Sequence, residues 1–433
     1  MIRNPFKREE NAFLKLVQSS AGRKADAVRR QRYYHDQQAD ETFRLIAQRF
    51  SDPASFRVFT INILRRIVDK SAATYRVAPK RVFSGWSQAA GEALYRSINA
   101  DAVLKRASRL TKLHKTTVMR VAWIEGDPAL YLHTPAILDV EAVDPERPDR
   151  IIVTHTASNP DGVTYSDWTA DRYTLRDHRG NRISSTDNPD GVNPYGALPF
   201  VPLFDALPDS DFFLPGGADL VEAQQAVNVA LSNLWRSVEL QAHGQAWASG
   251  VGAGTRLETG PNRAILLPTE GKFGFAAPNS PIDSILNAIE FVMRQVSATN
   301  AVGADIFDLS KSSESASAKA AARIDLKEAR ADDIALWRVS ESRLFDVLKA
   351  VVNTHKPGTI PAEASMRVDF ADQQDELTEA ESLANATTKQ ELGIWSPVDV
   401  LMNSNPDGYP TRADAYTELM RRRDETQTLT LPL

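Results

Sequence analysis

The residues that could carry chemistry begin with a glycine-rich run, GVGAGT, from Gly250 to Thr255. A phosphate-binding P-loop needs the pattern G-x-x-x-x-G-K-[ST], in which the Lys contacts the terminal phosphates. Here the run ends in Thr255-Arg256, and a turn-rich stretch follows where a phosphate-binding or dinucleotide-binding loop requires a helix. We therefore interpret the run as a flexible turn.

Residue types typical of catalytic sites are present, but they form no recognised pattern. The sequence has 0 Cys, which excludes thiol catalysis and disulfides. None of its 7 His belongs to an H-E-x-x-H motif, and it contains no G-x-S-x-G nucleophile elbow. The acidic run from Asp144 to Arg150, DPERPDR, lacks the spacing and the Gly of an EF-hand loop. We expect a protein that is not an enzyme and that needs no cofactor and no metal.

The length and net charge of the chain limit the classes of protein to which it could belong. The 433 residues are enough for two or three domains with real cores, and the net charge is -5. A protein that coats nucleic acid would carry a basic face, although a local basic strip is compatible with this charge. The N-terminal stretch is charged, and nowhere do 18 uncharged apolar residues follow one another. We expect neither a signal peptide nor a membrane span.

One stretch could touch nucleic acid without reading its sequence. It runs from Ser310 to Asp333, SKSSESASAKAAARIDLKEARADD, and passes without Gly or Pro from small polar residues into a helical pattern. Its basic residues are Lys311, Lys319, Arg323, Lys327 and Arg330. Acidic neighbours nearly cancel them, whereas a sequence-reading domain would have a denser basic cluster. A solvated helix face of mixed charge is the simpler interpretation.

Helical patterns dominate both ends of the chain. We expect helices over residues 11–50, 56–75, 87–113, 219–243, 282–298, 318–354 and much of 376–423, with a break at NSNPDGYP. The apolar face predicted for 219–243 consists of Leu220, Ala223, Val227, Leu231, Leu234, Val238 and Gln241. The apolar face predicted for 318–354 consists of Ile334, Trp337, Leu344, Leu348 and Val351.

The composition changes between residues 116 and 204. Val, Ile, Thr and Tyr are frequent there, and the turn-forming residues Gly, Pro, Asn and Asp interrupt them. The run TTVMRVAWIEGDPALYLHT predicts a hairpin, and further strands are expected over 263–267 and near Met366. Helices followed by strands and then by more helices predict an α+β fold that is mainly helical.

The order of these pieces resembles the portal proteins of tailed bacteriophages, of the siphophage type. The resemblance extends from about Tyr33 to Glu425. It rests on RYYHDQ, NILRRIVDKSAATYRVAPKR, LPFVPLFD, DLVEAQQAVNVALSNLWRSVELQA, TNAVGADIFDLSKSSESASAKAA and MRVDFADQQDELTEAE. The family's Ser-Gly-x-Ala pattern before the late helix is Ser-Ala-Ser-Ala here, from Ser315 to Ala318.

The resemblance implies a portal-like division of the chain. Its parts would be a wing (1–217), a stem helix (218–245), a clip (246–281), a second stem helix with a return to the wing (282–309), a tunnel loop (310–317), a tunnel helix (318–355) and a wing strand with a C-terminal crown (356–433). The resemblance also implies a homo-oligomeric ring, commonly of twelve subunits, at one vertex of the virion capsid, assembled in the host cytoplasm.

The function implied is a conduit for double-stranded DNA during packaging and ejection, without sequence specificity. The implied partners are the terminase large subunit, a head–tail adaptor, and the major capsid and scaffolding proteins. The implied DNA-channel residues are Lys311, Ser312, Ser313, Ser315, Ser317, Lys319 and Arg323. The implied partner-binding residues of the clip are Arg256, Glu258, Asn262 and Arg263.

Two other classes remain open. A hydrolase on the α+β section would need a catalytic constellation, and a non-viral scaffold or adaptor could also form a large ring. Assembly size separates these classes, because a ring has many times the 47.8 kDa of one chain.

Overall fold

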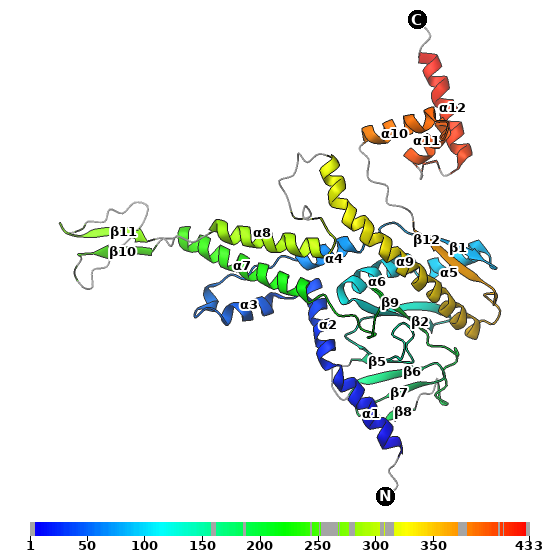
Figure 1. The fold of residues 1–433 in the computed structure, drawn as a ribbon, viewed down its shortest axis with the longest axis horizontal. Helices are drawn as coiled ribbons and strands as arrows, with labels where there is room; N and C mark the ends of the chain where they lie inside the picture. The colour runs from blue at the N-terminus through cyan, green and yellow to red at the C-terminus, as the bar shows by residue number, and fades with distance from the viewer. Residues whose placement is uncertain are drawn as a thin grey trace. The chain divides into compact units, whose positions relative to one another are not determined.

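The computed structural model describes residues 5–156, 162–184, 188–242, 245–250, 252, 267, 269–276, 282–303, 307, 316–370, 379–405, 408–409 and 411–429. The chain divides into two compact units, Met1–Phe370 and Ala371–Leu433. The described elements form the mainly helical α+β fold that the sequence predicts (Figure 1).

Helices are the most common regular element of the first unit. They are α1 (Pro5–Ser19), α2 (Ala21–Tyr34), α3 (Ala39–Ala47), α4 (Ile63–Ser71), α5 (Gln88–Ser97), α6 (Ala100–His114), α7 (Ala218–Ala242), α8 (Ile282–Thr299) and α9 (Ala316–His355). A short 3-10 helix, η1 (Pro53–Ser55), precedes α4. Within the described part of the chain, no helix is both long and apolar enough to cross a membrane.

The strands of the first unit form four antiparallel sheets. The strands are β1 (Lys80–Ser84), β2 (Thr116–Ile124), β3 (Asp127–His133), β4 (Leu138–Glu141), β5 (Arg150–His155), β6 (Thr164–Thr169), β7 (Tyr173–Arg176), β8 (Arg182–Ile183), β9 (Phe200–Phe204), β10 (Gln245–Ser249), β11 (Lys272–Ala276) and β12 (Ser365–Asp369). Their orders are β3-β2-β9, β4-β5-β6-β7-β8, β1-β12 and β10-β11.

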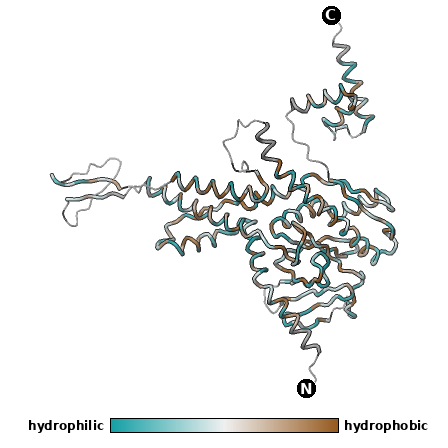
Figure 2. The backbone as a smooth tube through the Cα atoms, viewed as in Figure 1, coloured by the Kyte–Doolittle hydropathy of each residue, from teal (hydrophilic) through white to brown (hydrophobic). Residues whose placement is uncertain are grey.

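Strand β2 sends alternate side chains into two different cores, because successive residues of a strand face opposite sides. Met119 and Val121 pack with residues of α6 and α9 in the larger core. Val118 faces the other way and packs with Ile151 and Trp168 of the five-stranded sheet. The three-stranded sheet is therefore a middle layer, with helices over one face and a second sheet over the other (Figures 1 and 2).

The predicted hairpin is confirmed as β2 and β3, paired from Val118 with His133 to Ile124 with Asp127. The turn consists of Glu125 and Gly126, which both have positive φ. This turn type suits the right-handed twist of the two strands, and it favours Gly in the second position.

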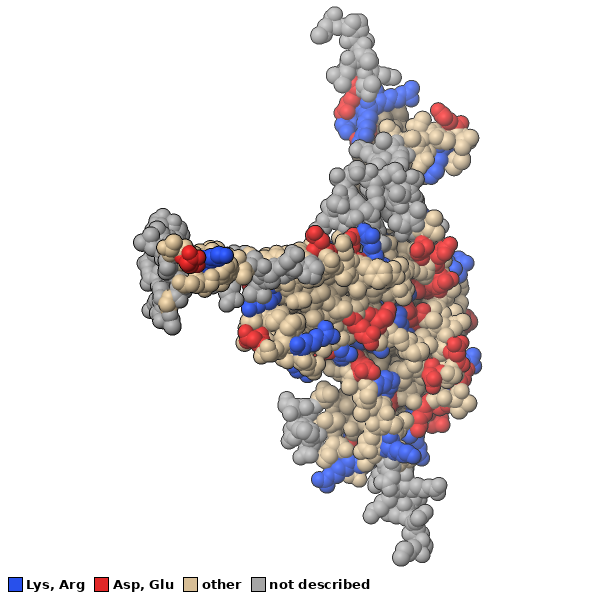
Figure 3. Space-filling view, turned by 60° about the vertical axis from the view of Figure 1, so that its left-hand side comes forward, with Lys and Arg blue, Asp and Glu red and all other residues tan. Residues whose placement is uncertain are grey.

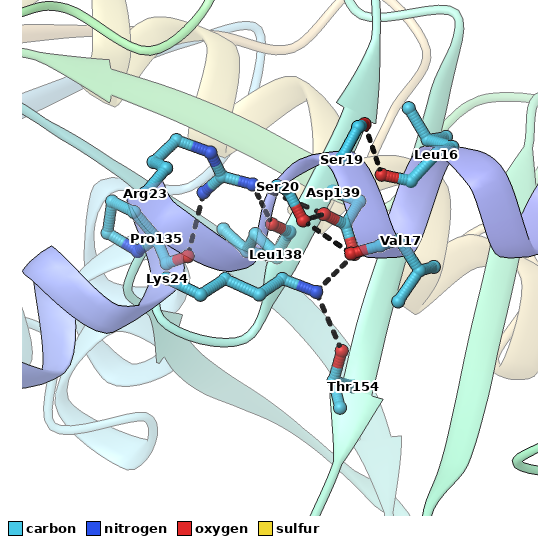
Figure 4. A network of polar contacts seen from close by, with 10 residues as sticks. All are labelled: Leu16, Val17, Ser19, Ser20, Arg23, Lys24, Pro135, Leu138, Asp139 and Thr154. Atoms are coloured by element: carbon cyan, nitrogen blue, oxygen red, sulfur yellow. Dashed lines mark hydrogen bonds and ion pairs between the residues drawn. The ribbon is translucent and has the colours of Figure 1, made fainter.

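A polar cluster joins the N-terminal helices to the five-stranded sheet (Figure 4). Asp139 of β4 is almost fully buried and accepts hydrogen bonds from Ser20, Arg23 and Lys24. Arg23 also donates to the carbonyl oxygens of Pro135 and Leu138, at 2.7 and 2.6 Å. Ion-paired and hydrogen-bonded on all sides, the Asp139 carboxylate fixes the junction of α1 and α2 on the sheet.

Three helix predictions were wrong in part. The helix expected over 11–50 divides into α1, α2 and α3, with interruptions at Ser20 and at residues 35–38. The helix expected over 56–75 begins only at Ile63, where the Asn62 side chain accepts a hydrogen bond from the Arg65 amide. The helix expected over 87–113 divides into α5 and α6 at Asn99, which has φ 51°. A left-handed residue interrupts a right-handed helix, and Asn tolerates this conformation better than most residues.

The strand expected near Met366 is confirmed as β12, but its partner was not predicted. Strand β1, from Lys80 to Ser84, pairs with it in antiparallel register. The segment 80–84 follows Pro79 and alternates buried Arg81 and Phe83 with more exposed residues, which is the period of a half-buried strand.

The second unit contains α10 (Glu379–Glu391), α11 (Pro397–Ser404) and α12 (Arg412–Leu429). A capping box begins α11, with Ser396 and Asp399 bonding each other's backbone amides. Arg412 at the start of α12 donates to the Asp399 carboxylate at 2.7 Å. The break predicted at NSNPDGYP lies between α11 and α12, so this prediction is confirmed.

Candidate functional site: the paired helices, the hairpin and the anchored long helix

Helices α7 and α8 lie side by side and connect through the sequence that holds strands β10 and β11 (Figure 1). Val227 of α7 and Ile289 of α8 are buried together with Ile63 of α4. With 25 and 18 residues, the two helices are about 38 and 27 Å long. They form the helix pair that the resemblance assigns to a stem.

The buried face of α7 is more polar than predicted. Gln224 and Asn228 are fully buried, and Ser232 nearly so, at intervals of four residues. Their side chains accept hydrogen bonds from the amides of Leu64, Ile61 and Phe59 at 3.0, 3.1 and 2.9 Å respectively. This polar row holds residues 59–62 in a non-helical conformation, which is why the helix predicted over 56–75 begins late.

The apolar stripe predicted for α7 is correct only in its first half. Leu220 and Val227 are buried, whereas Val238 is 38% exposed. Trp235, outside the predicted stripe, is 41% exposed and packs against Phe59 with ring centroids 5.2 Å apart. The second half of α7 therefore leaves apolar surface uncovered in the isolated chain.

The hairpin of β10 and β11 brings Trp247 opposite Gly274. A Cβ atom at Gly274 would lie 3.0 Å from the indole Nε1 of Trp247, so glycine makes room for the ring. Gly250 has φ +74°, and an added Cβ would lie 2.9 Å from the Glu270 carbonyl oxygen. Gly250 thus needs glycine both for its positive φ and for the close approach of a neighbouring backbone, while residues 251 and 253–255 of the predicted turn lie outside the described residues.

These two strands were not predicted, because the sequence favoured a strand over 263–267 instead. Residues 263–266 lie outside the described residues. The four predicted clip residues, Arg256, Glu258, Asn262 and Arg263, also lie outside them. The segments of β10 and β11, QAWAS and KFGFA, are short, and each mixes small residues with aromatic ones, which gives a weak strand signal.

Helix α9 contains 40 residues and is about 60 Å long. It begins at Ala316, two residues before the predicted start, so Ser317 is helical and not part of a loop. The alanine-rich sequence explains the earlier start, since Ala is the strongest helix former. Lys319 and Arg323 lie in this helix, with side chains outside the described set. Lys311, Ser312, Ser313 and Ser315 lie outside the described residues.

A buried ion pair anchors the second half of α9. Glu341 is fully buried and accepts hydrogen bonds from Arg81 Nε and Tyr75 Oη, both at 2.7 Å. Arg81 also pairs with Asp101 at 2.7 Å. Burial, followed by the nearby Glu341 carboxylate, raises the pKa of Tyr75 well above its usual value, so its hydroxyl remains a donor.

A second polar anchor lies eight residues earlier on α9. The Lys112 ammonium group bridges Asp333 and Asp205, at 2.8 Å from each, and Lys115 also pairs with Asp205 at 2.8 Å. Burial raises the pKa of Asp333. Burial acts in the same direction on Asp205, but Lys112 and Lys115 outweigh it and lower the pKa of Asp205.

The apolar stripe predicted for α9 is confirmed. Trp337, Leu344, Leu348 and Val351 are buried in the larger core, and Ile334 packs against it. Glu341 falls between Trp337 and Leu344 at the spacing of this stripe. A charged residue at an apolar position of a helix predicts a buried ion pair, and this signal was available in the sequence.

The described surface carries mixed charge. Figure 3 shows Lys and Arg interspersed with Asp and Glu over the visible face. In the part of the chain that the structure describes, no group of three or more His, Asp or Glu residues could hold a metal ion. The described candidate site consists of the α7–α8 helix pair, the β10–β11 hairpin and the anchored helix α9.

No protein-family model matches the chain, and no curated protein matches it. Among solved structures, one chain of the "Virion of native gene transfer agent (GTA) particle" is similar at 12% identity and a TM-score of 0.41, covering 76% of this chain and 84% of that one. A chain of the "Neck of native GTA particle computed with C12 symmetry" is similar at 14% identity and a TM-score of 0.41, covering 79% and 90%. Similarity at this level says nothing of function.

Proposed function

We propose that this protein is a portal-type subunit, which assembles into a ring at a capsid vertex and forms a conduit for double-stranded DNA. The observation that carries the proposal is the order of α7, the β10–β11 hairpin, α8 and the 40-residue α9. In this role α7 and α8 are the stem, and the hairpin contacts the terminase and the head–tail adaptor. The proposed role is structural and not catalytic.

Uncovered apolar residues on the helix pair support assembly. Trp235 of α7 and Leu286 and Phe291 of α8 are 41%, 46% and 63% exposed in the isolated chain. Large apolar side chains left exposed on packed helices are candidates for burial against a partner. In a ring, each subunit would cover these residues with its neighbour.

The contacts that anchor α9 are consistent with a role for this helix as a rigid mount for residues 310–315. The anchors at Asp333 and Glu341 and the apolar stripe all fix the second half of the helix to the sheets. The N-terminal half of the helix continues the same rod toward residues 310–315. A stiff rod of this kind would present small polar residues to a duplex without sequence-specific contacts.

Mixed charge is compatible with passage of DNA. A densely basic lining would bind phosphates by counterion release and resist sliding. The chain has a net charge of -5, and the predicted channel stretch nearly balances its basic and acidic residues. Such a surface suits a channel through which DNA slides better than a site that holds DNA tightly.

The test is the size and shape of the purified protein. Light scattering should give a mass many times the 47.8 kDa of one chain, and negative-stain images should show a ring with a central hole. A stable monomer at physiological salt and micromolar concentration would contradict the proposal. A monomer with hydrolytic activity would favour an enzyme instead.

A further inference from the structure

Arg120 lies between two sheets, and its side chain is partly exposed. It occupies the middle of β2, opposite Tyr131 of β3 and Phe200 of β9. It shares the strand face of Val118, which packs against the five-stranded sheet. An arginine at this position points into an interlayer that also holds the apolar and aromatic side chains of this core.

The guanidinium of Arg120 contacts aromatic rings but no acid. Its Cζ lies 5.0 Å from the ring centroid of Trp168 and 5.9 Å from that of Phe200. Its Nε is buried without a hydrogen-bond partner. No described carboxylate lies within ion-pair distance of it. Burial lowers the pKa of Arg120, and the nearby groups that oppose this shift are the hydroxyls of Tyr173, Tyr195 and Tyr131.

Two histidines lie close to Arg120, and burial, followed by the charge of Arg120, lowers the pKa of each. His133, diagonal to Arg120 on β3, has a buried Nε2 without a partner. Burial, followed by the charges of Arg120 and His155, lowers the pKa of His133 to about 4. His155 of β5 shares a hydrogen bond with Ser166 through its Nε2. We call Arg120, His133 and His155 the arginine–histidine cluster.

This cluster departs from the pattern of the other buried charges described above. Arg81 forms an ion pair with Glu341, Lys112 with Asp333, and Asp139 with Arg23 and Lys24. A buried cation without a counter-charge is strongly unfavourable, and buried polar groups are normally satisfied by a partner. Trp168 Nε1 is a further buried donor without a partner at the same place.

We propose that the arginine–histidine cluster binds a phosphate-type oxyanion between the two sheets. The guanidinium, the His133 imidazole and the Trp168 indole supply N–H donors on different elements, which suits an anion with oxygens in several directions. Tyr131, opposite Arg120 in the sheet, is 45% exposed, and His155 is exposed, so solvent reaches the edge of the cluster. The oxyanion provides the counter-charge that the chain itself does not.

The test is a titration of the full-length protein with inorganic phosphate, compared with sodium chloride at matched ionic strength. The Tm of the wild type should rise saturably with phosphate, because a ligand that binds only the folded state stabilises it. Arg120→Met should weaken the apparent affinity by about tenfold or more. Arg172→Met, which removes an exposed arginine nearby, is the matched control and should keep the wild-type response.

Two results would overturn the proposal. One is a wild-type Tm that responds to phosphate no more than to chloride, and this readout does not depend on any variant folding. The other is an Arg120→Met protein that retains the full phosphate response. If Arg120→Met does not fold, Arg120→Lys takes its place: it keeps the charge but loses the planar fork, and it should still weaken phosphate binding.

Discussion

Arg81 and Glu341 form a buried ion pair between β1 and α9, with Nε and Oε2 2.7 Å apart although the two residues are 260 positions apart in the sequence. Their side chains are 7% and 0% exposed. The pair fixes the long helix to the strand that pairs with β12. Its removal should therefore affect the whole first unit and not only α9.

Replacing Glu341 by Gln should lower the free energy of unfolding by about 3–5 kcal/mol, because Arg81 would keep a buried charge without its main partner. Urea unfolding followed by circular dichroism measures this change. Asp346→Asn is the matched control, since Asp346 is exposed and pairs with Lys349 only at 3.5 Å. A loss below about 1 kcal/mol for Glu341→Gln, the range of a surface pair, would show that the buried pair does not anchor the helix.

Gly91 and Gly22 should respond oppositely to replacement by Ala. Ala is the better helix former by up to about 1 kcal/mol, so Gly22→Ala in α2, where nothing lies within 4 Å of the new Cβ, should stabilise slightly. Gly91→Ala in α5 should destabilise, because the new Cβ would clash with the Phe83 ring. Thermal unfolding of the two variants compares them, and equal shifts would contradict the close packing at Gly91.

The buried His114 should make the protein sensitive to acid. Burial, followed by the charge of Arg30, lowers its pKa to about 3 in the folded state, against 6.5 in the unfolded chain. The stabilising effect of keeping His114 neutral is complete above pH 6.5. Below pH 6.5 the unfolded chain binds the proton first, so stability falls by about 1.4 kcal/mol per pH unit from this residue until pH approaches 3.

Replacing His114 by Leu should flatten this dependence, as measured by urea unfolding between pH 7 and pH 4. His35→Leu, at an exposed position, is the control and should leave the wild-type slope. If the His114→Leu protein lost stability toward acid as steeply as the wild type, another group would be responsible.

Gln224 should matter more than its neighbour Gln225. Gln224→Leu leaves the Leu64 amide and the Ile61 carbonyl without their partner, at a cost of about 1–3 kcal/mol for each buried group. Gln225 bonds the Glu41 side chain, which can turn to water, so Gln225→Leu should cost less. Hydrogen exchange should show faster exchange of the Leu64 amide only in Gln224→Leu. Equal effects of the two variants would argue against the polar row on α7.

Negative charge in the predicted channel stretch should block DNA passage and spare assembly. Replacing Ser312, Ser313, Ser315 and Ser317 by Asp adds four charges that repel phosphate. Packaging or retention of DNA should fall, while the particle seen by light scattering stays unchanged. Ser51→Asp with Ser97→Asp, at exposed positions elsewhere, is a control for added charge. If packaging were unimpaired, we would conclude that this stretch does not contact the DNA.

The elements that could be predicted from the sequence are those in which local pattern and final burial agree. The stripe from Trp337 to Val351 and the hairpin of β2 and β3 are of this kind. The late start of α4 could not be predicted, because residues 59–62 take their conformation from polar groups on α7, far along the chain. Strand β1 was missed for a similar reason, since its partner comes only at β12.

For the candidate site, the helices could be predicted from the sequence, but the ion pairs and hydrogen bonds between them could not. The helix pair and the long helix follow from periodicity. The ion pairs of Glu341 and Asp333 depend on which charged residues the folded chain brings together, and Arg120 is conspicuous only once its strand face is known. Charge at an apolar register position is the one signal that pointed to Glu341 in advance.

The pairing of β1 with β12 also has a consequence for synthesis. The ribosome synthesises β1 early and β12 late. The β1 segment therefore has no strand partner while α7, α8 and α9 emerge from the ribosome. Folding of the first unit can finish only after residue 370 has left the exit tunnel, and long-range closure of this kind is slow. During that interval the nascent chain exposes a strand edge, which makes it a natural client for chaperones.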